Sequence, residues 1–156
     1  MNTKISFPPI CRDAGLLVLR LSVGGLMLFH GIYKLAHSTT FAGVDSFIGG
    51  LLASHGLPAL LSYGVPLGEV VAPLLIILGV CTRISSALIA FTMVMSLFLV
   101  FGADTFALSM TGGLSTEVNF LYLLGAVALF LTGPGKLSCY RGENAFLIRL
   151  CRCLKK

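Results

Sequence analysis

The stretch Leu67-Gly68-Glu69-Val70-Val71-Ala72-Pro73 sets a carboxylate in the middle of the apolar run from Ala59 to Val80. That run is long enough to cross a bilayer, where an ionisable side chain costs at least a few kcal/mol unless it is paired or hydrated. Pro73 has no N–H to give the carbonyl of Glu69, so the helix is expected to kink around the carboxylate. Glu69 therefore needs a partner, or a use, inside the membrane.

The composition indicates an integral membrane protein. Of the 156 residues, 56% are hydrophobic and only 11% are charged, and the mean hydropathy is +0.97. A soluble domain usually carries about 25% charged residues. We expect one membrane domain over residues 1–156 and no separate soluble module. The net charge of +5 is interpreted as a topology signal, because the basic residues cluster at the ends of apolar segments; no nucleic-acid partner is expected.

The apolar segments predict an all-α bundle of four transmembrane helices. The expected spans are about residues 14–36, 59–80, 84–103 and 117–132. The third span carries no ionisable residue and is expected to face lipid or to serve as a scaffold. Between the first two spans, a short interfacial helix with its apolar side down is predicted from residues that recur at helical spacing, namely Phe41, Val44, Ile48, Leu51 and Leu52.

The last span and the tail carry their own signals. Ser115 is expected to cap the span, and Gly133-Pro134-Gly135 is expected to end it. Residues 137–156 resume helical spacing and are expected to form a basic amphipathic tail on an anionic membrane surface. Cys151 and Cys153 have the C-x-C spacing of a soft-metal site, but the sequence offers no further ligand nearby, so no metal is expected.

The distribution of basic residues predicts that both termini are cytoplasmic. All five cysteines then face the reducing compartment, where structural disulfides are not expected. The basic residues outside the spans that gather on this side are Lys4, Arg12, Arg83, Lys136, Arg141, Arg149, Arg152, Lys155 and Lys156.

Charged and titratable side chains inside the spans form the candidate site: Arg20, His30, Lys34, Glu69 and Glu117. At about 1.5 Å of rise per residue, Arg20 lies about 9 Å from the cytoplasmic end of its helix and Glu69 about 15 Å from the outer end of its own. A hydrocarbon core of about 30 Å leaves an axial offset of about 6 Å, which an arginine covers. We therefore expect Arg20 to pair with Glu69, with His30 as a titratable neighbour.

Two interpretations of these residues remain open. In the first, Arg20 and Glu69 form a structural ion pair, with His30 and Lys34 as interface anchors. In the second, the residues line a polar pocket, open to the outer leaflet, that holds a quinone headgroup or another small polar ligand and exchanges protons with it. A histidine ring can change charge near neutral pH, as such chemistry needs. Glu117 is either a site member or a helix-start residue.

The chain also resembles the DoxX family of small four-helix bacterial membrane proteins. The resemblance rests on an ordered set of motifs from about residue 14 to 138: Leu19-Arg20-Leu21, Gly24-Gly25, Phe29-His30-Gly31, Lys34-Leu35, Gly68-Glu69, Leu78-Gly79, Thr82-Arg83, Glu117 and Thr132-Gly133-Pro134-Gly135. It implies a bacterial inner-membrane protein. The relative that gave the family its name is a membrane subunit of a thiosulfate:quinone oxidoreductase, and other members are linked to membrane oxidoreductase complexes. The polar lead before Asp13 and the cysteine-containing tail depart from the family pattern.

Together these observations favour a membrane subunit of a quinone-linked oxidoreductase complex. Quinone is expected as a bound substrate, and no intrinsic cofactor is expected, because the sequence lacks haem, flavin, dinucleotide and Fe–S fingerprints. The electron carrier would come from a partner subunit; a homo-oligomer is the other expected assembly. The alternatives are a non-enzymatic membrane anchor or assembly factor for a soluble partner, and a small-solute transporter.

Overall fold

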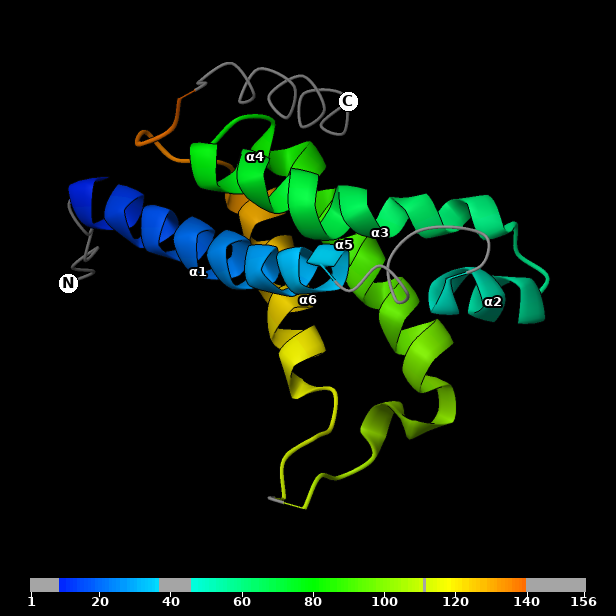
Figure 1. The fold of residues 1–156 in the computed structure, drawn as a ribbon. Coiled ribbons are helices and arrows are strands. Elements are labelled where there is room, and N and C mark those ends of the chain that lie inside the picture. The colour runs from blue at the N-terminus through cyan, green and yellow to red at the C-terminus, as the bar shows by residue number, and fades with distance from the viewer. Residues whose placement is uncertain (1–8, 37–45, 111, 140–156) are drawn as a thin grey trace, which may run out of the picture.

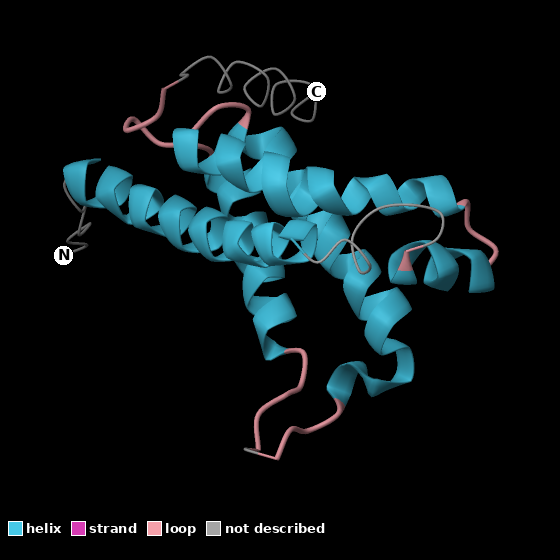
Figure 2. Cartoon of the chain, in the orientation of Figure 1, coloured by secondary structure: helices cyan, strands magenta, loops and turns pink. Residues whose placement is uncertain are grey.

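The computed structural model describes residues 9–36, 46–110 and 112–139, and most of these residues are helical. Figure 2 shows helices joined by short loops. Within the described residues the one β feature is an isolated bridge between Leu108 and Leu114. The helical elements in chain order are α1 (Pro9–Ala36), α2 (Phe47–Ser54), η2 (Ala59–Tyr63), α3 (Gly64–Pro66), η3 (Leu67–Val71), α4 (Ala72–Leu78), α5 (Thr82–Ser96), η4 (Leu97–Phe101), η5 (Gly102–Phe106) and α6 (Glu117–Thr132).

Three continuous helical stretches are long and apolar enough to cross a membrane. They cover Ile10–Ala36, Ala59–Leu78 and Thr82–Phe106, while Glu117–Thr132 is a shorter apolar helix. The first helix begins at Pro9 rather than at residue 14, because proline is tolerated in the first turn, where its missing N–H is not needed. The predicted all-helical membrane architecture is confirmed, with the first and third helices longer than expected.

The second stretch is interrupted where the sequence predicts it. It passes from the 3₁₀ helix η2 through α3 into the π-helix η3, which contains Glu69, and then into α4. The two prolines, Pro66 and Pro73, remove N–H donors from this region, and a local π turn is one way in which a membrane helix adjusts to such a loss. The departure from regular α geometry around Glu69 is therefore confirmed.

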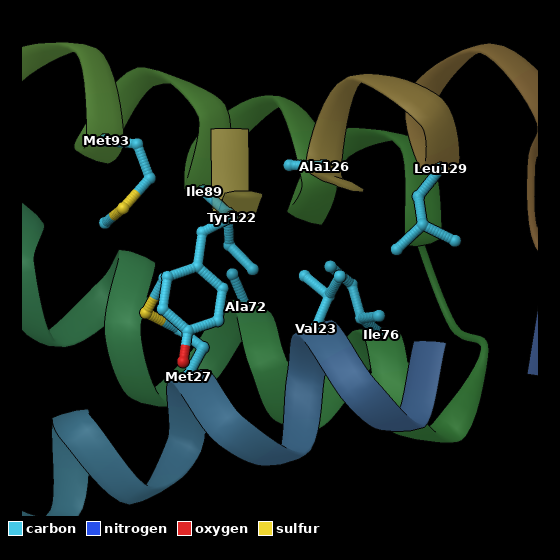
Figure 3. Close-up of a cluster of buried hydrophobic side chains, with 9 residues drawn as sticks. All are labelled: Val23, Met27, Ala72, Ile76, Ile89, Met93, Tyr122, Ala126 and Leu129. Atoms are coloured by element: carbon cyan, nitrogen blue, oxygen red, sulfur yellow. The ribbon is translucent and has the colours of Figure 1, made fainter. Parts of the chain in front are cut away.

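The helices meet in one apolar core. Figure 1 shows α1 and the α3–α4 stretch running side by side in opposite directions, with α5 and α6 steeply inclined to them. Figure 3 shows that each of α1, α4, α5 and α6 sends side chains into the core. The third stretch thus serves as a scaffold through its contribution to the core. The buried members are Val23, Met27, Ala72, Ile76, Ile89, Met93, Tyr122, Ala126 and Leu129.

Two glycines of α1 allow the backbone of the second stretch to approach closely. A Cβ at Gly31 would overlap the backbone carbonyl of Glu69, and a Cβ at Gly24 would lie 3.0 Å from the carbonyl oxygen of Pro73. Small residues permit this kind of helix contact in membranes. The crossing fixes the register of α1 against η3 and places Gly31 level with Glu69.

The end of α6 is held by an arginine from α5. The helix stops at Thr132, as predicted, and Gly133 follows with φ 79°, which glycine adopts without strain. Arg83 Nη1 donates to the carbonyl of Phe130 at 2.9 Å, so it satisfies one of the last carbonyls of the helix. At the other end of α6 the expected Ser115 cap is wrong. Thr116 precedes the helix, and its hydroxyl donates to the carbonyl of Thr105 at 2.6 Å.

The predicted short helix between the first two spans is present as α2. Its N-cap is Ser46, whose hydroxyl oxygen accepts from the N–H of Gly49 at 3.0 Å. Phe41 and Val44, also expected in this helix, lie outside the described residues, as does the tail from residue 140 onward. α2 packs beside η2 (Figure 1), and part of its apolar side forms a wall of the cavity described below.

We predict that Gly31→Ala destabilises the protein by about 1–3 kcal/mol, because the new methyl group forces α1 away from the backbone of Glu69. The measurement is chemical unfolding in mild detergent. Gly25→Ala is the matched control, since a Cβ at that position meets no atom within 4 Å. Equal stability of the two variants would show that the close crossing does not form.

Candidate functional site

Glu69 pairs with Lys34. The Lys34 Nζ donates to Glu69 Oε1 at 2.6 Å; the lysine side chain is 36% exposed and the carboxylate side chain 5%. The crossing at Gly31 explains the pairing, because Lys34 follows Gly31 by about one helical turn and so projects next to the carboxylate. The cation partly reaches the surface while the anion remains buried.

A cavity of about 400 Å³ adjoins this ion pair. Its walls come from the end of α1, from α2, from the η2–η3 stretch and from α5 with η4, and they are mostly apolar. Several lining residues are themselves exposed at the protein surface, so the cavity has an apolar rim there: Leu60, Leu61, Leu67, Phe91 and Val100. This volume falls in the range of about 300–1,000 Å³ that is usual for small-molecule sites.

One oxygen of Glu69 is left unsatisfied. Oε1 bonds to Lys34, but Oε2 is buried and has no hydrogen-bond partner in the described part of the chain. A buried polar atom without a partner costs about 1–3 kcal/mol, and more when it is charged. Such atoms in native proteins usually have a partner such as water, an ion or a ligand. Because Glu69 lines the cavity, a ligand there could supply the missing donor.

Two hydroxyl groups of α5 also line the cavity. Thr92 abuts Gly68 and donates to the carbonyl of Leu88 at 2.9 Å. Ser96 Oγ instead accepts from the side-chain amide of Asn119 in α6, at 3.1 Å. Sequence reasoning missed these groups because it searched the spans for ionisable residues, and isolated hydroxyls on a helix give no comparable signal.

The predicted Arg20–Glu69 pair is wrong. Arg20 is buried, with 1% exposure, and its Nη2 donates to the backbone carbonyl of Leu137. Its Nη1 packs against Gly79, at the end of α4, where a Cβ would not fit. Since Gly79 lies ten residues beyond Glu69 in a helical stretch, the two side chains are attached about 15 Å apart along the axis.

The error came from aligning the helix ends. The expected register placed residue 14 level with Val80, but α1 begins at Pro9 and extends past the end of α4. Arg20 consequently lies level with Gly79 and anchors the segment after α6. Asp13 acts on the same segment, because its Oδ1 accepts from the backbone N–H of Lys136 at 3.3 Å.

His30 and Glu117 do not line the cavity. His30 is exposed, and its Nδ1 donates to the carbonyl of Leu26 at 3.1 Å. The ring also meets the edge of Tyr122, with 5.8 Å between centroids. Glu117 is exposed in the first turn of α6, beside Gly113. Of the candidate residues, the structure therefore brings together only Lys34 and Glu69 at the cavity.

The cysteines in the described residues, Cys11, Cys81 and Cys139, are free thiols. Over the same residues no group of three or more histidine, cysteine, aspartate or glutamate side chains could hold a metal ion. Cys151 and Cys153 lie outside the described residues. At the cavity, Lys34 and Glu69 offer hydrogen-bond donors and acceptors to a ligand.

Comparison with known proteins places this site in a family. The family model named DoxX matches residues 15–102, which is more than half of the chain. The chain belongs to the DoxX family. It is also similar to "Putative oxidoreductase CatD" of Bacillus subtilis (strain 168), at 29% identity over 121 residues that cover 78% of this chain and 81% of the relative. No solved structure matches the chain.

The DoxX match contains every residue that lines the cavity, from Lys34 to Val100. It also contains Arg20 and Arg83, which hold the segment around the end of α6. Glu117 and Asn119 lie beyond it. The cavity and its ion pair are therefore built from the DoxX region, while α6 completes the packing around it.

We predict that a pair of double-mutant cycles separates the two possible partners of Glu69. The Lys34→Met/Glu69→Gln cycle should give a coupling of at least about 1 kcal/mol, because these side chains touch. The Arg20→Gln/Glu69→Gln cycle should give less than about 0.5 kcal/mol, because they do not. Chemical unfolding in mild detergent supplies the free energies, and the reverse order of couplings would reinstate the arginine as the partner.

Proposed function

We propose that this DoxX protein is a membrane subunit of a quinone-linked oxidoreductase complex and binds the quinone headgroup in the cavity beside Glu69. The observation that carries the proposal is the buried Glu69 Oε2, which has no hydrogen-bond partner among the described residues and belongs to a side chain that lines a mostly apolar cavity. A ligand that fits must be mainly apolar and must bring a hydrogen-bond donor to that oxygen. A quinol headgroup has both properties.

The ion pair suits both redox states of such a ligand. Lys34 Nζ carries three N–H donors and uses one on Glu69, so it can also donate to a quinone carbonyl. Reduction of a quinone to a quinol takes up two electrons and two protons, and the quinol O–H can then donate to Glu69 Oε2. In this proposal Glu69 passes the two protons one after the other at that oxygen, and an electron-carrying cofactor of a partner subunit supplies or takes up the two electrons.

Two further observations support the proposal. The exposed apolar rim gives a ligand dissolved in the bilayer a surface from which to enter the cavity. The Bacillus relative also bears the name "Putative oxidoreductase CatD". The test below therefore identifies the ligand itself.

We also propose a topology of four spans, with both termini on the cytoplasmic side of a bacterial inner membrane. α6 is 16 residues long and spans about 24 Å, close to a hydrocarbon core of about 30 Å. Contacts from Asp13 and Arg20 to residues 136 and 137 hold the start of α1 next to the segment after α6. This places the basic residues Arg12 and Lys136 at the same end of the molecule, as cytoplasmic ends require.

We predict that Glu69→Gln abolishes quinone retention, because the amide no longer accepts a proton and offers a donor where the quinol needs an acceptor. The protein is purified from its native membrane in mild detergent, and mass spectrometry is run on the extracted small molecules and on the co-purifying proteins. Wild type and Glu117→Gln should both retain quinone in stoichiometric amount. Glu117→Gln is the matched control because Glu117 lies outside the cavity.

A wild-type protein that carries only bulk lipid would contradict the quinone proposal. A soluble partner that co-purifies equally with wild type and Glu69→Gln would then favour the membrane anchor, with Lys34 and Glu69 as a structural pair. Quinone retention that is unchanged in Glu69→Gln would equally remove Glu69 from the binding site.

A further inference from the structure

Ser96 differs from three other hydroxyl residues on the helices of this protein. Ser86, Thr92 and Thr132 each donate their hydroxyl proton to the carbonyl four residues earlier, which is the usual arrangement inside a helix. Ser96 makes no such bond among the described residues. Its oxygen accepts from Asn119 Nδ2 at 3.1 Å, and its own O–H remains available. Because Ser96 lines the cavity, this proton is a free donor at the cavity wall.

The position of Ser96 relative to the ion pair is set by helix geometry. Thr92 abuts Gly68, the neighbour of Glu69, so this turn of α5 lies level with the carboxylate. Ser96 follows one turn later, about 6 Å further along the helix axis. The cavity therefore offers polar groups at two levels, with Lys34 and Glu69 at the first and Ser96 at the second, and mainly apolar walls around them.

We propose that Ser96, held in place by Asn119, donates a hydrogen bond to a second polar group of the ligand, so that the cavity selects a ring with oxygens at opposite ends. This inference rests on the proposed function and specifies its substrate class as a 1,4-quinone. One carbonyl meets Lys34 and Glu69, and the opposite carbonyl accepts from Ser96. After reduction, the second oxygen still accepts from Ser96 as a hydroxyl. A ligand with one polar end would leave the Ser96 donor unused.

The test compares one probe that has a carbonyl at each end of the ring with one that has a single carbonyl. Equilibrium dialysis with the full chain in mild detergent measures the Kd of a 2-alkyl-1,4-naphthoquinone and of the 2-alkyl-1-tetralone that carries the same alkyl group. Ser96→Ala should weaken binding of the naphthoquinone about fivefold, the usual effect of one lost hydrogen bond, and should leave binding of the tetralone unchanged. Ser96→Thr keeps the hydroxyl and should restore the difference between the probes.

Asn119→Ala should reproduce the loss, because a Ser96 released from Asn119 can donate to the carbonyl four residues earlier instead. Equal weakening of both probes by Ser96→Ala, or no weakening of either, would overturn the role of Ser96 while leaving the quinone site intact. A wild-type protein that binds neither probe, or a Glu69→Gln variant that binds both as wild type does, would instead overturn the proposed function. The failures of the two proposals are thus distinguishable.

Discussion

A buried carboxylate that must be neutralised within an apolar bundle is the constraint on which the rest of this structure depends. Glu69 is 4% exposed and finds its cation on α1, not on its own helix. That pairing requires α1 to cross the second helical stretch closely, and Gly31 makes the approach possible. The π-helix η3 and the prolines around it complete the arrangement, because they place Glu69 on a segment whose backbone is not regular α-helix.

The charged side chains inside the bundle make two kinds of contact. Two arginines donate to backbone carbonyls: the buried Arg20 to Leu137 and the half-buried Arg83 to Phe130, so the chain leaving α6 is fastened to α1 and α5. Near the middle of the second stretch, Lys34 and Glu69 adjoin a mostly apolar cavity, and one carboxylate oxygen has no partner among the described residues. The arginines thus stabilise backbone carbonyls, whereas Lys34 and Glu69 adjoin a cavity that can receive a ligand.

Much of this organisation could be predicted from the sequence, because the bilayer penalises the features that mark it. The interrupted helix was predicted from the cost of burying Glu69 and from the prolines beside it. The end of α6 was predicted from the Gly-Pro-Gly sequence that follows it. The partner of Glu69 could not be predicted in the same way. The cost of burying a carboxylate indicates that a cation must pair with it. The register of the two helices determines which cation lies close enough to do so. That register depends on Gly24, Gly31 and the start of α1 at Pro9. Ser96 was missed for a related reason, since its free donor exists only because Asn119 from α6 occupies its oxygen.

The exposed apolar rim of the cavity determines which ligand concentration governs binding to this protein. A ligand that enters across Leu60 and Phe91 comes from the bilayer and not from water. Its working concentration is then set by partitioning, to which each methylene of an alkyl tail adds about 0.8 kcal/mol. Partitioning enriches apolar molecules in the bilayer. The polar groups inside the cavity then need to discriminate only among these molecules. A binding site with few polar contacts can therefore be selective, because the bilayer has already excluded the molecules that do not partition into it.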